Sequence, residues 1–143
     1  MADSAMEGGG SEIDSDVMDL ASRMFDLARS GDTETLVAYL DAGVPVNLTN
    51  TNGDTLVMLA TYHGHPATAA ALIERHADVN RHNNRGQTPL MAAVFKDETG
   101  VIDMLLRADA DPLAGSPSAL ETAKYFGRED TRRRLEQHIA EQR

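Results

Sequence analysis

A block of sequence recurs in this chain at an offset of 33 residues. A Gly-x-Thr tripeptide opens the block at Gly53 and opens it again at Gly86. The positions that follow match at the same offset, with Ala60 matching Ala93, Leu72-Ile73 matching Leu105-Leu106, and Ala77-Asp78 matching Ala110-Asp111. A period of this length is typical of arrays in which each unit buries its apolar face only by stacking on its neighbours. The chain is therefore predicted to fold as a solenoid.

Each unit has the local signals of two short helices. Thr88 can accept a backbone N–H as a helix N-cap, and Pro89 suits the first helical position, where its missing donor costs nothing. Gly64 follows the first helix of its unit, where a left-handed residue is favoured, and Pro66 then begins the second helix. Each unit is predicted to be a pair of antiparallel helices.

Four short motifs in fixed order resemble those of ankyrin repeats. Thr-Pro-Leu is complete at residues 88–90 and keeps only its threonine at 55–57, Gly-His stands at 64–65, and Ala-Asp-Val-Asn at 77–80. The resemblance implies an all-α solenoid of about four helix-turn-helix repeats with short β-hairpin fingers. The chain also resembles small stand-alone bacterial members of the family.

The domain organisation follows from the repeat and from a change of composition. Residues 1–15 contain three glycines and several acids but no base, so they are predicted to be a disordered acidic tail. Residues 16–143 form the array, with repeats predicted at about 16–49, 50–82, 83–115 and 116–143. The fingers are predicted at 46–55 and 79–88, and the last helix at about 129–141.

The chain departs from the family pattern at several positions. Met58 and Met91 stand where the family has a histidine, so packing must replace the hydrogen bonds of that histidine. His76 and Asp109 replace the glycine that ends the second helix, which introduces strain if φ is positive there. Ser118 follows Thr88 by 30 residues, so the last finger is three residues short.

Composition and charge exclude several classes of protein. The net charge of −10 opposes a phosphate backbone, so no nucleic-acid partner is expected. No apolar run approaches the about 20 residues of a membrane span, and no signal peptide is evident. A cytoplasmic monomer without membrane contact is expected. The chain has no cysteine, so it has neither disulfides nor a thiol nucleophile.

No pattern of a catalytic or cofactor site occurs, so we expect no enzyme and no cofactor. His63, His65, His76 and His82 could form a metal or ligand-binding module, which is one alternative function. The repeat geometry places them apart, at a helix end, a helix start, a rear turn and a finger. We therefore expect no metal site.

The resemblance implies binding on the concave face, which is formed by the finger tips and the ends of the first helices. The corresponding positions are Thr51, Asn52, Asp54, Tyr62, His63, His82, Asn84, Arg85, Gln87, Phe95, Lys96, Tyr125 and Phe126. Four of the six Phe and Tyr residues fall on these positions. Phe126 is the ring expected to tuck between adjacent repeats. The predicted function is a non-catalytic adaptor that binds another protein; the other alternative is an inhibitor or immunity-type protein that blocks an enzyme.

Overall fold

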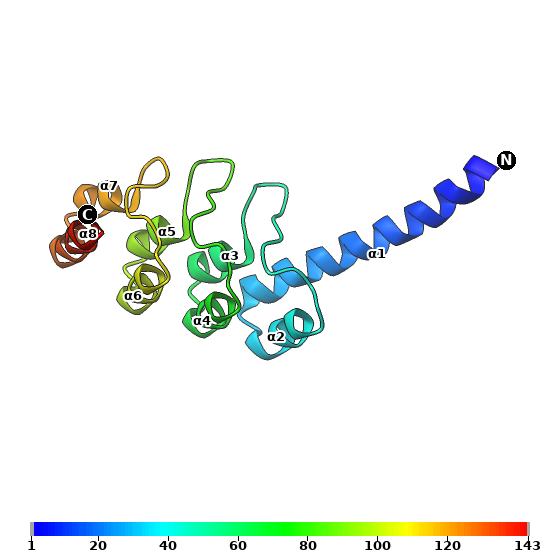
Figure 1. Ribbon diagram of the computed structural model, residues 1–143, viewed down its shortest axis with the longest axis horizontal. Helices are drawn as coiled ribbons and strands as arrows, with labels where there is room; N and C mark the ends of the chain where they lie inside the picture. The colour runs from blue at the N-terminus through cyan, green and yellow to red at the C-terminus, as the bar shows by residue number, and fades with distance from the viewer. Residues whose placement is uncertain (1, 143) are drawn as a thin grey trace.

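The chain forms a single row of helix pairs, seen in a computed structural model that describes the backbone of residues 2–142 and the side chains of residues 15–142. The helices of this part are α1 (Ala2–Ser30), α2 (Thr33–Asp41), α3 (Leu56–Tyr62), α4 (Pro66–Glu74), α5 (Pro89–Phe95), α6 (Thr99–Arg107), α7 (Ala119–Tyr125) and α8 (Glu129–Glu141). The first helices of the pairs (α1, α3, α5, α7) form one layer, and the second helices form the other (Figure 1). The predicted all-α solenoid is confirmed.

Helix starts in the array follow the predicted caps. Oγ1 of Thr55 and Oγ1 of Thr88 each accept the backbone N–H three residues further on, at 3.1 Å. Ser118 occupies the same place in the last repeat and forms a capping box with Glu121. Each cap satisfies a backbone donor that the first turn leaves free. The repeated cap explains why α3, α5 and α7 begin in register.

Several helix ends adopt left-handed backbone geometry. Gly64 closes α3 with φ 80°, whereas Asp97 holds the equivalent position after α5 with φ 58°. His76 and Asp109 end the second helices of their repeats, both with φ 65°. These non-glycine residues therefore carry the strain that the sequence indicated, about 1–3 kcal/mol each.

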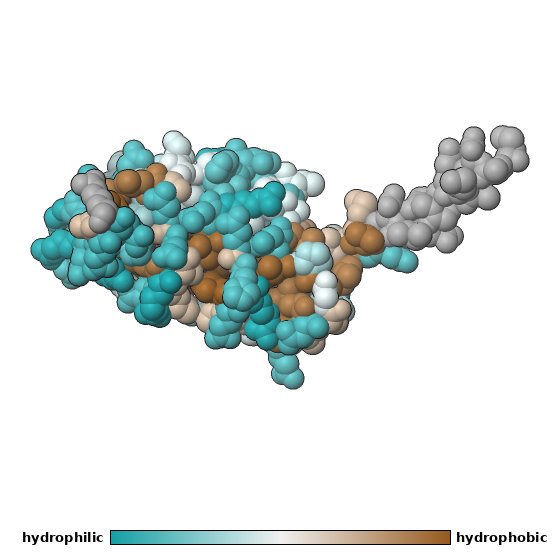
Figure 2. Space-filling model, viewed as in Figure 1, coloured by the Kyte–Doolittle hydropathy of each residue, from teal (hydrophilic) through white to brown (hydrophobic). Residues whose placement is uncertain are grey.

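The core consists of two clusters that meet near the middle of the array. Met24, Leu36, Leu56 and Leu72 belong to the cluster of the first two repeats, and all four are fully buried. The cluster of the last two repeats contains Leu90, Val94, Leu105, Leu106 and Leu135. Ile73 packs against both clusters. Each repeat thus buries its apolar residues against its neighbours, as a solenoid requires. On the side of the array seen in Figure 2, hydrophobic residues show between hydrophilic ones.

The fingers differ from the β-hairpins that the sequence predicted. Among the described residues the only β pairing consists of two isolated bridges, Thr49 with Thr55 and Gly115 with Ser118. Side-chain amides at the turn occupy donors that a ladder would use. Oδ1 of Asn83 accepts the backbone N–H groups of residues 85 and 87, at 2.9 Å and 3.0 Å.

Asparagines repeat this role along the array. Oδ1 of Asn50 accepts two backbone N–H groups in the first finger, both at 3.0 Å, as Asn83 does in the second. At the finger bases, Oδ1 of Asn47 accepts the N–H of Asp78 at 2.8 Å. Asn80 does the same for Asp111 at 2.7 Å. The second set of bonds joins each repeat to the next.

Helix α1 begins at Ala2 rather than near residue 16. Its N-terminal part extends beyond the array (Figure 1). Once residues 16–30 are helical, each further residue adds one hydrogen bond without a new nucleation step, and no proline interrupts the chain there. The side chains of residues 1–14 lie outside the described residues. The sequence predicted residues 1–15 to be a disordered acidic tail, whereas the described backbone is helical from Ala2. That this tail can be removed without loss of stability stays a prediction.

Helix α8 closes the array at its predicted bounds, Glu129–Glu141. Leu135 is fully buried, and Ile139 is half-buried. His138 is also buried, which the sequence did not indicate. One face of α8 therefore packs on the last repeat.

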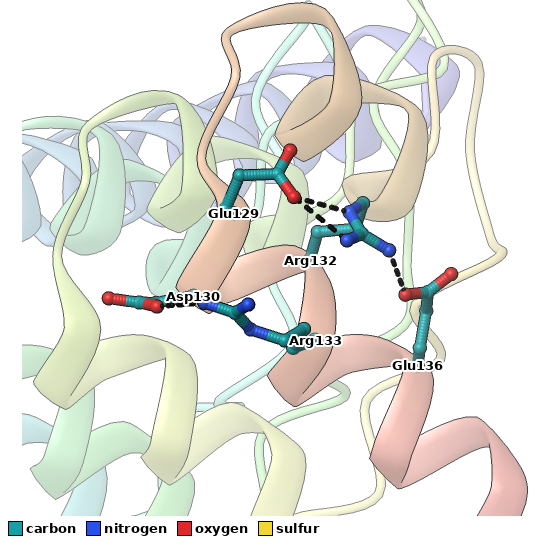
Figure 3. A network of polar contacts seen from close by, with 5 residues as sticks. All are labelled: Glu129, Asp130, Arg132, Arg133 and Glu136. Atoms are coloured by element: carbon teal, nitrogen blue, oxygen red, sulfur yellow. Dashed lines mark hydrogen bonds and ion pairs between the residues drawn. The ribbon is translucent and has the colours of Figure 1, made fainter.

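The other face of α8 has a network of ion pairs (Figure 3). Arg132 contacts both Glu129, at 2.8 Å, and Glu136, while Arg133 pairs with Asp130 at 2.6 Å. These pairs lie three or four residues apart, so they stabilise the helix itself. A charged outer face of this kind lets α8 serve as a C-terminal cap.

Cross-repeat hydrogen bonds at the helix ends are interrupted at one joint. Nε2 of His65 lies 2.7 Å from the carbonyl oxygen of Arg29, and Nη2 of Arg128 donates to the carbonyl of Phe95 at 3.2 Å. Glu98 is the equivalent residue in the third repeat, and an ionised carboxylate has no hydrogen to donate. Its buried Oε2 has no hydrogen-bond partner within the described part of the chain.

We expect Glu98→Gln to raise the free energy of unfolding by about 1 kcal/mol, because an amide of the same shape supplies a donor. Glu98 precedes α6, so losing its charge removes a favourable interaction with the helix dipole of about 0.3–1 kcal/mol. This loss is smaller than the cost of leaving a buried polar group unsatisfied, which is about 1–3 kcal/mol. Urea denaturation measures the change. The control is Glu34→Gln, at an exposed position in the first turn of α2. An equal gain in Glu34→Gln would contradict the explanation.

Candidate functional site

The concave face begins with finger tips that are fixed to one another. The backbone N–H of Asn84 donates to the carbonyl of Asn52 at 2.9 Å, and its side-chain amide donates to the carbonyl of Thr51 at 3.0 Å. Asn83 Nδ2 donates to a carboxylate oxygen of Asp54 at 2.8 Å. Backbone and side-chain bonds together hold the two fingers in one relative position.

A hollow of about 300 Å³ lies between the fingers and the end of α3, and we call it the Tyr62 pocket. It is lined by Arg29, Asn50, Asn52, Asp54, Met58, Leu59, Tyr62, His63, Asn83, Asn84, Arg85 and Gln87. The pocket brings together residues of the first three repeats. Its lining is mostly polar, with the ring of Tyr62 among the side chains.

A second hollow, of about 530 Å³, lies at the ends of α5 and α7, and we call it the aromatic shelf. It is lined by Gln87, Met91, Phe95, Pro117, Glu121, Thr122, Tyr125 and Phe126. Gln87 lines both hollows, so they adjoin. The concave face therefore has two adjoining hollows, one with a mostly polar and one with a mostly apolar lining, which we together call the groove.

Four aromatic rings of the groove remain accessible to solvent. The exposed fractions are 42% for Tyr62, 44% for Phe95, 83% for Tyr125 and 47% for Phe126. The Phe126 ring meets Phe95 of the preceding repeat edge to face, with 5.6 Å between centroids. Phe126 thus packs between repeats as expected, yet about half of it stays exposed.

Basic side chains lie beside these rings. Lys96 Nζ lies 4.8 Å from the centroid of the Tyr62 ring, which joins the second repeat to the third. The guanidinium of Arg128 lies 5.7 Å from the Phe126 ring and also pairs with Asp97, at 3.3 Å. Contacts of this type contribute about 0.5–1 kcal/mol at exposed sites. They hold the rings in place and set positive charge along the groove.

The pKa of His63 lies below its ordinary value. Partial loss of solvent around the imidazole is the largest cause. Nearby positive charge is the second cause, and it comes from Arg29, His65 and Lys96. The Asp54 carboxylate acts in the opposite direction. The charged form of the imidazole is therefore disfavoured at this position.

Ten of the thirteen predicted residues line the groove, and three do not. Lys96 contacts the groove only through Tyr62. Thr51 and His82 are exposed on the fingers, and Nδ1 of His82 lies 2.9 Å from the carbonyl oxygen of Asn83. These side chains lie at the margin of the groove.

The sequence analysis missed the groove residues Asn50, Met58, Leu59, Asn83, Met91, Pro117, Glu121 and Thr122. A signal for some of them was present. Met58 and Met91 precede Tyr62 and Phe95 by four residues, so each pair shares one helix face. Both methionines are buried, and each lines the same hollow as the ring on its helix. Arg29, at the end of α1, also lines the groove and stands 33 residues before Tyr62 in the repeat.

The predicted histidine positions do not converge. In the part of the chain described, no three His, Asp or Glu side chains are placed to hold a metal ion. His65 is engaged at the joint with the first repeat, and His76 lies in the turn after α4. Within the same described residues, no helix is long and apolar enough to cross a membrane.

Stacked helix pairs with projecting fingers and a groove on the finger side define a repeat solenoid. A family model described as "Ankyrin repeats (3 copies)" matches residues 24–115, and the chain belongs to the ankyrin repeat family. Ankyrin repeats are generally protein–protein interaction modules without catalytic activity.

A curated protein of Pseudomonas aeruginosa, whose name describes an ankyrin repeat protein, is 46% identical to this chain over 57 residues. The match covers 40% of this chain and 33% of that protein, so the chain matches about a third of the relative's length. The similarity therefore extends to a bacterial protein.

Proposed function

We propose that this protein is a non-catalytic adaptor that binds a partner protein in the groove of the concave face. The observation that carries the proposal is the set of four exposed rings, Tyr62, Phe95, Tyr125 and Phe126, along one groove. Aromatic side chains dominate the binding energy of protein interfaces and are unfavourable to leave in water. The other two aromatic residues are less accessible to solvent: Phe25 is buried and Tyr39 is half-buried.

The rigidity of the groove supports the same proposal. The finger tips are joined by the hydrogen bonds of Asn83 and Asn84, and the rings contact one another or a cation. A preorganised surface loses little conformational entropy on binding, so more of the contact energy contributes to affinity. A rigid groove with aromatic anchors suits recognition rather than catalysis.

We expect Tyr62→Ala and Phe95→Ala each to weaken partner binding by about 1–3 kcal/mol, because truncation removes an anchor. The partner is first captured from the native host with the wild-type chain, and its affinity for each variant is then measured by calorimetry. Both rings are more than two fifths exposed, so stability should change by less than about 1 kcal/mol.

Leu113→Ala provides the matched control, because Leu113 is 56% exposed and lies outside the groove. It should leave partner binding unchanged. If the captured partner binds Tyr62→Ala and Phe95→Ala as tightly as the wild type, the groove is not the binding site.

A further inference from the structure

Positive charge gathers at the groove of a strongly acidic protein. The chain has a net charge of −10, yet the Tyr62 pocket is lined by Arg29 and Arg85 and bordered by Lys96. Asp54 is the acidic side chain among the lining residues of this pocket, and it accepts a hydrogen bond from Asn83 at 2.8 Å. Arg29 pairs with Asp26 at 3.0 Å. Among the residues that line or border this part of the groove, the basic side chains still outnumber the acidic ones.

The acidic residues of the aromatic shelf are also engaged. A carboxylate oxygen of Glu121 accepts the backbone N–H of Ser118 at 3.0 Å, and this bond lowers the pKa of Glu121. Asp97, next to Lys96, pairs with Arg128. Within the described residues, Arg85 and Lys96 form no ion pair. Two cations are thus available to a ligand beside exposed rings.

The titration of His63 supports the sign of this charge. Loss of solvent is the largest cause of its lowered pKa. Among the charges, Arg29, His65 and Lys96 lower the pKa, and their effect exceeds the opposite effect of Asp54. The His63 ring, which meets the Tyr62 ring edge to face, is therefore surrounded by more positive than negative charge. The local charge at the Tyr62 pocket is thus opposite in sign to the net charge of the chain.

We propose that the groove binds an acidic segment of the partner that contains aromatic or other large apolar side chains. Its carboxylates would lie beside Arg85 and Lys96, and its apolar side chains would pack on Phe95 and Tyr125. This inference rests on the proposed function and names the chemistry of the partner. Because the chain has a net charge of −10, an acidic segment meets repulsion over much of the surface and attraction beside these cations, which favours one binding register.

The probe is a synthetic peptide that alternates glutamate and phenylalanine, with two analogues in which glutamine or lysine replaces every glutamate. Binding to the full chain is followed by amide chemical shifts at several salt concentrations. We expect the glutamate peptide to bind most tightly and to weaken as salt screens the charges. Residues of the Tyr62 pocket and the aromatic shelf should show the shifts.

Arg85→Gln and Lys96→Gln should each weaken the glutamate peptide roughly 2- to 5-fold, the effect expected for one exposed charge pair, and leave the glutamine peptide unchanged. Arg107→Gln is the matched control, because Arg107 is an exposed cation at the end of α6, in the other helix layer. It should leave the affinity of every peptide unchanged.

Other outcomes would overturn the inference. Equal or tighter binding of the glutamine or lysine peptide, or no binding of any peptide, contradicts an acidic ligand. Tighter binding of single-stranded oligothymidine would indicate nucleic-acid stacking instead. Self-association that Arg85→Gln abolishes would make a second copy the occupant. In each case the proposed function is judged separately, by the effect of Tyr62→Ala on the captured partner.

Discussion

Leu72→Ala and Leu105→Ala are each expected to lower the free energy of unfolding by about 2–5 kcal/mol, because they remove buried methyl groups and leave a cavity. Both side chains are fully buried, and they occupy the same place in successive repeats, on α4 and α6. Chemical denaturation followed by circular dichroism measures the loss. Leu72 belongs to the first core cluster and Leu105 to the second.

Hydrogen exchange locates the damage and distinguishes core from binding surface. Since each repeat is stabilised by its neighbours, Leu72→Ala should expose the amides of the first two repeats most, and Leu105→Ala those of the last two. Tyr62→Ala should leave protection near that of the wild type. If Tyr62→Ala unfolds the chain as readily as Leu72→Ala, the ring belongs to the core and the groove loses an anchor.

Gly115→Ala is expected to destabilise the array by about 2–4 kcal/mol, combining left-handed strain with overpacking. Gly115 has φ +88°, and a Cβ there would lie 2.7 Å from the backbone carbonyl oxygen of Gly86. Backbone cannot rotate away as a side chain can, and Ser116 donates to the same oxygen at 2.9 Å. The third finger would therefore separate from the second. Thermal unfolding of the variant measures the effect.

Gly43→Ala separates the two causes of this loss. Gly43 also has positive φ, +109°, but a Cβ there meets nothing within 4 Å. It should lose only the conformational part, about 1–2 kcal/mol. Equal losses in both variants would show that the approach of the third finger to the second contributes nothing.

Much of the fold could be predicted because its signals are local and repeated. The caps at Thr55, Thr88 and Ser118 each use a side chain and a backbone group three residues apart. Neighbouring residues of the sequence are sufficient to predict such a bond. The strained geometry of His76 and Asp109 was foreseen for the same reason, since the repeat shows where glycine is missing.

The residues at the rim of the groove were predicted from the sequence, and those at its floor were not. Rim residues such as Tyr62 and Arg85 could be predicted from the family resemblance. Pro117 and Thr122 line the groove because the last repeat stacks beside the end of α5. That juxtaposition depends on how repeats stack. The replacement of finger strands by the turns of Asn50 and Asn83 was missed because side-chain and backbone acceptors compete closely there.

The interrupted series of bonds at Glu98 has a mechanical consequence. At the joint between the second and third repeats the finger tips are tied together by Asn83 and Asn84, while the helix ends lack the cross-link that His65 and Arg128 supply elsewhere. Two repeats that are joined at one edge alone can rotate about that edge. We therefore expect the two helix pairs to separate more easily at this joint than at the others, with the finger tips as the axis.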